Sequence, residues 1–325
     1  MGEEVTPLVT PERSDRRFKD EEWDKNALFD FLKQSYLITA RWAVDMVKRA
    51  DLDEHTRRKA RFYVEQITNA FSPSNFIFTN PEVLRATLAS NGQNLIEGLD
   101  HLKRDLEEGQ GRLRIKQTDM AAFEIGRNLA MTPGKVVFQN EVMQLIQYAP
   151  STPKVREIPL VIAPPWINKF YILDLNEKKS FIRWAVAQGY TVFVISWANA
   201  AEQGSYKSFN DYMQRGFLKA VDVAREICGT KKVNAIGYCV GGTLVASALG
   251  WLAAKGEDKV NAVTFFTTQV DFEKAGDLLV YVDEEQVKWI ESRMAEKGYL
   301  PGRRMADAFN LLRSNDLIWS YVVNN

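Results

Sequence analysis

The chain has 325 residues, enough for two domains and a sizeable core. Lys and Arg total 42 and Asp and Glu total 42, which argues against a nucleic-acid binder that works through a broad basic field. Hydrophobic residues make up 46%, yet no apolar run reaches the roughly 18 to 20 residues that a membrane span needs. The N-terminus has no apolar signal segment and two cysteines make no disulfide framework, so we expect a protein of the reducing cytoplasm.

The first part of the chain has helical periodicity. Residues 1–22 are charged and contain proline, which is typical of a loose tail. Over residues 23–70 apolar side chains recur at three- and four-residue steps, which predicts a helix. A second helix is predicted over residues 80–107, because Asn80 is suited to cap its first turn. We therefore predict a mainly helical N-terminal domain over residues 23–153.

After residue 153 apolar strands alternate with helices. This rhythm predicts an α/β domain with a mostly parallel, doubly wound sheet over residues 154–270. Such sheets bind ligands at the carboxyl ends of their strands. The pattern loosens over residues 271–325, which we predict to be helical. The strands are expected near residues 136–139, 142–148, 159–163, 191–196, 232–237 and 260–267, and the helices near 178–188, 212–228, 244–255, 283–297 and 303–323.

One motif carries chemistry: Gly237-Tyr238-Cys239-Val240-Gly241-Gly242, between a predicted strand and a predicted helix. A nucleophile elbow has this form, with Gly237 and Gly241 needed where backbone passes close to backbone. A cysteine where most such enzymes carry serine points to acyl transfer. The position at a helix N-terminus favours the thiolate of Cys239. The alternative is a small, buried, apolar cysteine.

An acyl-transfer site also needs N–H donors for the negative oxygen of the tetrahedral intermediate. The residue after the nucleophile, Val240, is expected to supply one backbone donor. The second is expected from the loop after the strand near 159–163, where Pro164 and Pro165 have no N–H. We favour Ile167 among the three remaining candidates, which are Trp166, Ile167 and Asn168.

The usual partners of an elbow nucleophile are missing from the chain. Elbow enzymes place the acid and then the histidine after the nucleophile, but His55 and His101 both precede Cys239. Asp271 follows a strand, as some triad acids do, yet no histidine follows it. Cys228 lies at a predicted helix end and is interpreted as packing. No His or Cys residues are spaced as metal ligands, so no metal is expected.

Four stretches carry a likeness to known proteins: 164–175, 196–199, 237–243 and 315–319. They resemble one family, the polyhydroxyalkanoate (poly-3-hydroxybutyrate) synthases. The residues Tyr238 and Val240 beside the cysteine are similar to those of the class I, single-subunit type, which prefers short-chain monomers. Residues 71–76 and 80–82 resemble the N-terminal domain of that family.

The resemblance implies an α/β-hydrolase fold preceded by a mainly helical domain. It assigns residues 154–270 to the first part of the catalytic domain and residues 271–325 to the start of its cap. The family's aspartate and histidine lie further along than this chain extends. The resemblance therefore implies a truncated synthase with an incomplete sheet, whose 260–267 strand is an open edge. We expect no polymerase activity from these residues alone.

The function implied is that of an acyltransferase. It polymerises (R)-3-hydroxyacyl-coenzyme A, with 3-hydroxybutyryl-coenzyme A as the expected short-chain case, into polyhydroxyalkanoate through a thioester on Cys239, and releases coenzyme A. No cofactor is implied beyond this substrate. The implied partners are the growing polyester, a second copy of the chain and granule-associated proteins, at the surface of cytoplasmic granules. Two alternatives stay open: a cysteine-variant thioesterase or dienelactone-type hydrolase, and a non-catalytic module that binds granules or a partner.

Overall fold

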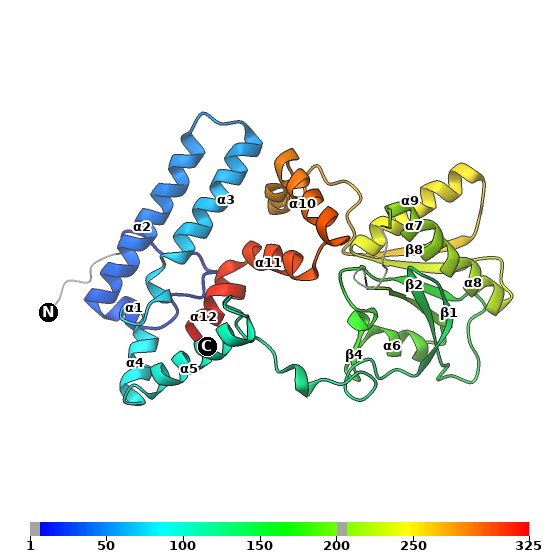
Figure 1. The fold of residues 1–325 in the computed structure, drawn as a ribbon, viewed down its shortest axis with the longest axis horizontal. Helices are drawn as coiled ribbons and strands as arrows, with labels where there is room; N and C mark the ends of the chain where they lie inside the picture. The colour runs from blue at the N-terminus through cyan, green and yellow to red at the C-terminus, as the bar shows by residue number, and fades with distance from the viewer. Residues whose placement is uncertain (1–6, 200–206, 325) are drawn as a thin grey trace. The chain divides into compact units, whose positions relative to one another are not determined.

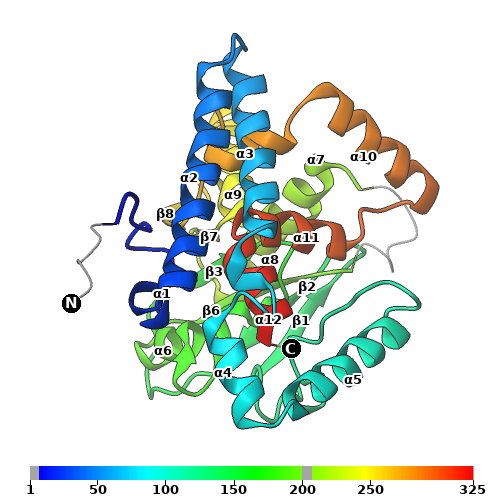
Figure 2. The same cartoon turned by 90° about the vertical axis from the view of Figure 1, so that its left-hand side faces the viewer.

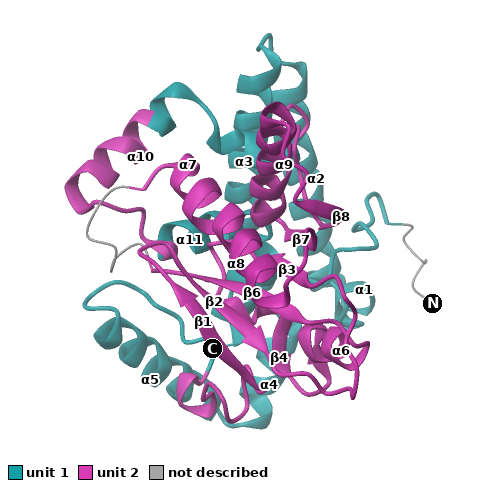
Figure 3. Cartoon of the chain, turned by 90° about the vertical axis from the view of Figure 1, so that its right-hand side faces the viewer, with its two compact units in different colours: residues 1–118, 275–287, 303–325 teal, residues 119–274, 288–302 magenta. Residues whose placement is uncertain are grey.

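The computed structural model describes residues 7–199 and 207–324. The chain divides into two compact units, coloured separately in Figure 3. Unit 1 consists of Met1–Thr118, Ala275–Val287 and Arg303–Asn325, and unit 2 consists of Asp119–Lys274 and Lys288–Gly302. No helix of the described residues is both long enough and apolar enough to cross a membrane.

Unit 1 is built from helices, and its two longest, α2 and α3, lie side by side in both Figure 1 and Figure 2. Helix α10 (Glu284–Lys297) begins in unit 1 and ends in residues assigned to unit 2. The other helices of unit 1 are α1 (Glu22–Lys25), α2 (Ala27–Arg49), α3 (Glu54–Ala70), α4 (Pro81–Ala89), α5 (Gln93–Glu108), α11 (Gly302–Leu312), whose first residue is assigned to unit 2, the π-helix η7 (Asn315–Trp319) and α12 (Ser320–Asn324), with 3-10 turns at Pro73–Asn75 and Gly276–Tyr281.

The two long helices predicted from periodicity are each interrupted. The 23–70 segment breaks at Asn26 and again before α3, where Asp53 is extended and its side chain accepts the Thr56 N–H. The 80–107 segment breaks after α4, because Asn91 and Gly92 both have positive φ. Apolar spacing continued through these breaks, so periodicity alone did not locate them.

Asn80 caps α4, as the sequence predicts. Its side-chain oxygen accepts the backbone N–H of Glu82 at 2.9 Å and of Val83 at 3.4 Å. Its amide also donates to the Ser74 carbonyl at 2.7 Å, and the residue is buried. The Asn80 side chain therefore provides an acceptor for the first N–H groups of α4 and also fixes the turn that precedes the helix.

A segment from the second half of the chain packs within unit 1 against α3. The ring of Tyr281 meets that of Phe62 edge to face, with centroids 5.8 Å apart, and its hydroxyl donates to the Ala308 carbonyl. Burial raises the pKa of Tyr281 to about 12. Lys59 Nζ lies 2.6 Å from a carboxylate oxygen of Asp283, which also caps α10. These contacts tie the segment after the sheet to the N-terminal helices.

Unit 2 contains a six-stranded sheet in the order β1-β2-β6-β3-β7-β8. Strands β3, β6, β7 and β8 are parallel, and β1 and β2 are antiparallel additions on one side. Strand β8 is the opposite edge among the described residues. The strands are β1 (Gly134–Gln139), β2 (Met143–Tyr148), β3 (Leu160–Ala163), β6 (Val192–Trp197), β7 (Val233–Tyr238) and β8 (Val260–Phe266), and a two-stranded ribbon joins β4 (Asp174–Asn176) to β5 (Lys179–Ser180).

Helices cover both faces of the central strands. Alternate strand residues belong to two separate apolar clusters, because successive side chains of a strand point to opposite faces. Helix α6 (Phe181–Ala187) packs on one cluster. The other is packed by α8 (Lys219–Cys228) and α9 (Val240–Lys255), together with a π-helix, η5 (Tyr212–Leu218), that follows the short α7 (Phe209–Asp211). The sequence predicts a plain helix over 212–228, and its first half is wound as a π-helix.

The Asn80 cap yields a stability prediction. Asn80→Ala removes three hydrogen bonds and leaves a buried carbonyl unpaired, so we expect a loss of roughly 1 to 3 kcal/mol in the free energy of unfolding. Asn26→Ala is the matched control, since Asn26 is exposed and its side chain accepts one N–H, from Leu28. Urea unfolding of both variants measures the difference. Equal losses would show that burial of the Asn80 amide contributes nothing.

The Lys59–Asp283 pair yields a pH prediction. The hydrogen bond from Lys59 holds the pKa of Asp283 well below its ordinary value of 3.8. The stability it adds is therefore full above that value and is lost as pH falls toward the pKa in the folded protein. We expect Asp283→Asn to lower the melting temperature at pH 7, with the gap to the parent chain closing below about pH 4. Asp307→Asn, at an exposed position on α11, is the control. A gap that does not change with pH would contradict the assignment.

Candidate active site

Cys239 lies at the junction between β7 and α9. Its backbone has φ 54° and ψ −126°, in a region that residues other than glycine rarely adopt. A conformation of this kind persists only where the surrounding structure enforces it, and such positions cluster at active sites. The side chain is exposed. The residue therefore sits at a sharp bend with its thiol open to solvent, which is the geometry of a nucleophile elbow.

Three glycines make this bend sterically possible. A Cβ on Gly237 would overlap the Cα of Gly242, and a Cβ on Gly241 would overlap the Ala163 carbonyl oxygen at the end of β3. A Cβ on Gly242 would overlap the hydroxyl of Thr268, which follows β8. The structure thus gives a packing reason for Gly237 and Gly241, which the sequence singles out, and adds Gly242.

Hydrogen bonds hold the bend against the end of β8. The Cys239 N–H donates to the Phe266 carbonyl at 2.9 Å, and the Cys239 carbonyl accepts the N–H groups of Gly242 and Thr243. The Thr243 hydroxyl donates to the Gln269 carbonyl at 2.8 Å. Cys239 is therefore held on both sides, by its own helix and by the neighbouring strand.

The first turn of α9 presents unused donors beside the thiol. No acceptor is recorded for the backbone N–H of Val240 or Gly241 within residues 7–199 and 207–324. The first N–H groups of a helix have no partner inside it and point outward, where they bind negative charge. Val240 is thus placed as the sequence predicts, and its role as a donor to the reacting oxygen stays a prediction.

The loop after β3 supplies the second candidate donor. The Asn168 N–H donates to the Pro165 carbonyl at 3.2 Å, so it is engaged in a turn. In the described part of the chain no acceptor is recorded for the N–H of Trp166 or of Ile167, and Ile167 is exposed. The three candidates from the sequence are thereby reduced to two, of which Ile167 remains our choice.

None of the other residues singled out in the sequence has a hydrogen bond or ion pair to Cys239 among the described residues. His55 on α3 and His101 on α5 belong to unit 1, whereas Cys239 belongs to unit 2. Asp271 is exposed, and its carboxylate accepts the Glu273 N–H. Cys228 is partly buried, and burial raises the pKa of its thiol. The described residues contain no group of three His, Cys, Asp or Glu side chains that is placed to hold a metal ion.

Two supporting residues were not singled out in the sequence. Thr268 fills the space over Gly242, and its hydroxyl lies 3.2 Å from the carbonyls of Gly237 and Phe266. Trp197, at the end of β6, donates its indole N–H to the Pro164 carbonyl at 2.7 Å. Both contacts join segments that are far apart in the sequence, so the local sequence pattern did not predict the role of Thr268. Trp197 was included only as part of the stretch 196–199 that resembles the family.

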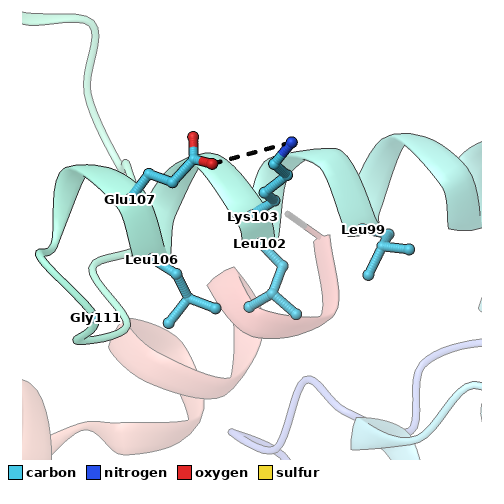
Figure 4. Close-up of a pocket in the computed structure, with 6 residues that line it drawn as sticks. All are labelled: Leu99, Leu102, Lys103, Leu106, Glu107 and Gly111. Atoms are coloured by element: carbon cyan, nitrogen blue, oxygen red, sulfur yellow. Dashed lines mark ion pairs between the residues drawn. The ribbon is translucent and has the colours of Figure 1, made fainter.

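A separate hollow of ≈ 450 Å³ lies on α5 in unit 1 (Figure 4). Leu99, Leu102 and Leu106 point to one side of this helix, and Lys103 pairs with Glu107 at 4.0 Å on another. The lining is mainly apolar and contains no thiol, hydroxyl or imidazole group. Its two polar side chains, Lys103 and Glu107, are paired with each other, so the candidate acyl chemistry is assigned to Cys239.

The tight packing of the elbow yields a matched pair of substitutions in one helix. Gly241→Ala places a Cβ against the carbonyls of Ala163 and Pro164, so we expect a loss of roughly 3 kcal/mol or more in the free energy of unfolding. Gly250→Ala, two turns further along α9, meets nothing within 4 Å and is expected to gain up to about 1 kcal/mol. Urea unfolding checks both, and a tolerated Gly241→Ala would contradict the close approach.

Comparison with known proteins agrees with this geometry. Residues 14–185 match the family described as "Poly-beta-hydroxybutyrate polymerase (PhaC) N-terminus", and residues 165–310 match the family described as "alpha/beta hydrolase fold". The second match confirms the predicted fold class.

Several curated relatives cover nearly the whole chain. A poly(3-hydroxyalkanoate) polymerase of Methylorubrum extorquens is 56% identical over 100% of the chain and 54% of its own length. Polymerase subunits PhaC of Rhizobium meliloti (strain 1021) and Cupriavidus necator are 52% and 43% identical, over 100% and 96% of the chain. Each of those two is covered over 53% of its own length, so the chain spans about half the length of these relatives. The chain belongs to the poly-beta-hydroxybutyrate polymerase (PhaC) N-terminus family.

Proposed function

We propose that the chain carries the acyl-accepting half of a polyester-forming acyltransferase, with Cys239 as its covalent nucleophile. The observation that carries this proposal is the exposed thiol on a strained bend at the start of α9, beside backbone N–H groups with no recorded acceptor among the described residues. Family membership and the names of the relatives support a 3-hydroxyacyl substrate, and delivery of that group as a thioester is part of the proposal.

In the first step the Cys239 sulfur attacks the carbonyl carbon of a hydroxyacyl-coenzyme A. The carbonyl oxygen becomes negative, and the N–H groups of Val240 and of Ile167 donate hydrogen bonds to it. The carbon–sulfur bond to coenzyme A then breaks, and coenzyme A leaves as a thiol with the proton from Cys239. One thioester replaces another, so the acyl group remains activated.

In the second step the hydroxyl of another hydroxyacyl unit attacks the Cys239 thioester. An ester bond forms, the thiol of Cys239 is regenerated, and the chain of ester units grows by one. A base must accept the hydroxyl proton. Both histidines of the sequence, His55 and His101, precede Cys239, whereas elbow enzymes place the histidine after the nucleophile. We therefore expect these 325 residues to accept an acyl group without sustained polymerisation.

The preferred monomer and the partners are also proposals. The residues beside the nucleophile, Tyr238 and Val240, support a short (R)-3-hydroxyacyl group such as 3-hydroxybutyryl. Work at a granule surface as a homodimer, with granule-associated proteins, is supported by large apolar side chains exposed on unit 1. These include Phe31, Trp42, Phe71 and Phe78, which are 65%, 62%, 71% and 83% exposed.

Acylation of a single cysteine tests the proposal. We expect the chain incubated with 3-hydroxybutyryl-coenzyme A to gain the mass of one hydroxybutyryl group, and peptide mapping to place it on Cys239. Cys239→Ala is expected to abolish the adduct, whereas the control Cys228→Ala keeps it, because Cys228 is partly buried and its thiol is hard to ionise. Intact-protein mass spectrometry after an acid quench gives the measurement.

The products discriminate between the alternatives. Steady release of 3-hydroxybutyrate would indicate a thioesterase or a dienelactone-type hydrolase. The absence of any adduct, with the fold intact, would favour a binding module without catalysis. An adduct that survives Cys239→Ala would remove the proposed nucleophile, and insoluble polyester made by the chain alone would contradict the expected need for a histidine base.

A further inference from the structure

The Pro164–Pro165 peptide creates an unusual demand for a hydrogen-bond donor. Its carbonyl, on Pro164, is buried, and the same peptide has no N–H because the next residue is proline. Buried carbonyls are almost always paired. The indole N–H of Trp197 meets this demand at 2.7 Å. The Trp197 side chain, at the end of β6, thus fixes the Pro164–Pro165 peptide, whose carbonyl lies beyond the last residue of β3.

The fixed peptide touches the start of α9. A Cβ on Gly241 would lie 2.7 Å from the Pro164 carbonyl oxygen and 2.8 Å from its carbon. The peptide that Trp197 holds is therefore pressed against the turn that presents the Val240 N–H. The next two N–H groups along the loop belong to Trp166 and Ile167, the candidates for the second donor. The position of that peptide sets the separation between the two donors.

The π-helix η5 is shaped around the same tryptophan. Gly216 lies inside it, and a Cβ there would be 2.6 Å from the Trp197 ring. Tyr212, its first residue, packs its ring 5.4 Å from that of Trp197 and 5.2 Å from that of Trp166. π-helical turns are rare and frequently occur at functional sites. Here the π-helix brings Gly216 and the ring of Tyr212 against the indole ring.

We propose that Trp197 is a positioning residue for acyl transfer. It holds the Pro164–Ile167 segment so that the backbone N–H of Ile167 faces the same oxygen of the tetrahedral intermediate as the backbone N–H of Val240. The inference rests on the proposed function of Cys239. Trp197 acts through the loop and does not itself touch the acyl group. The indole N–H of Trp197 therefore affects how well the tetrahedral intermediate is stabilised. It does not change how readily a small reagent reaches the Cys239 thiol.

Two reactions of the same thiol separate this role from simple packing. Acylation by 3-hydroxybutyryl-coenzyme A passes through a negative oxygen, whereas alkylation by iodoacetamide displaces iodide and needs no such donors. We expect Trp197→Phe to reduce the maximal acylation rate constant roughly ten- to a hundredfold, with the half-saturating thioester concentration within about twofold of the parent value. The alkylation rate is expected to stay within about twofold of that of the parent chain.

Controls keep the result interpretable. Trp184→Phe, at an exposed position on α6, makes the same chemical change away from the loop and is expected to leave both rates unchanged. Should Trp197→Phe unfold, replacing Trp197 with 3-benzothienylalanine keeps the bicyclic ring and removes only the N–H, and the same loss of acylation is expected.

Three outcomes would overturn the inference. Equal acylation of the Trp197 variants and the parent chain would show that the N–H positions nothing. Full acylation in the benzothienyl variant, together with a loss in Trp197→Phe, would reduce Trp197 to packing. A parent chain that is alkylated at Cys239 but never acylated would instead refute the proposed function, and the inference with it.

Discussion

The first turn of α9 lies against the ends of two strands with no room for a side chain between them. Gly241 meets the end of β3 and Gly237 meets Gly242, so main chain packs directly on main chain. This close contact between α9 and the strand ends determines three features of the site. It forces Cys239 into its rare backbone conformation, turns the thiol outward and brings the loop after β3 beside the first N–H groups of the helix. A single methyl group at any of these glycines would separate the layers.

The parallel strands explain why these parts meet. Strands β3, β7 and β8 run side by side in the same direction, so the residues that follow them gather at one edge of the sheet. The loop with Trp166 and Ile167 follows β3, Cys239 follows β7 and Thr268 follows β8. Alternating apolar side chains fasten helices to both faces of these strands and fix the edge as a rigid support. Precise placement of donors requires such a support, because reacting groups tolerate little displacement.

Local chemistry was predictable and long-range geometry was not. The Asn80 cap, the apolar strands and the glycine-flanked Cys239 are signals carried by adjacent residues, and the structure has each of them in place. The breaks at Asn26 and at Asn91–Gly92 were missed, because the apolar period continued across them. The π-helix depends on the fit of Gly216 to a tryptophan some twenty residues away. Contacts between distant segments leave no mark on a single sequence, so the contact of Thr268 with Gly242 could not be predicted.

The backbone conformation of Cys239 opposes the presence of a reactive side chain to the stability of the folded protein. At φ 54° a side chain is tolerated only under constraint, and glycine would relax there without cost. The thiol therefore stands at a position where the backbone conformation favours glycine, which has no side chain. Selection for thermal stability alone would therefore favour glycine at this position over the cysteine that we propose as the nucleophile.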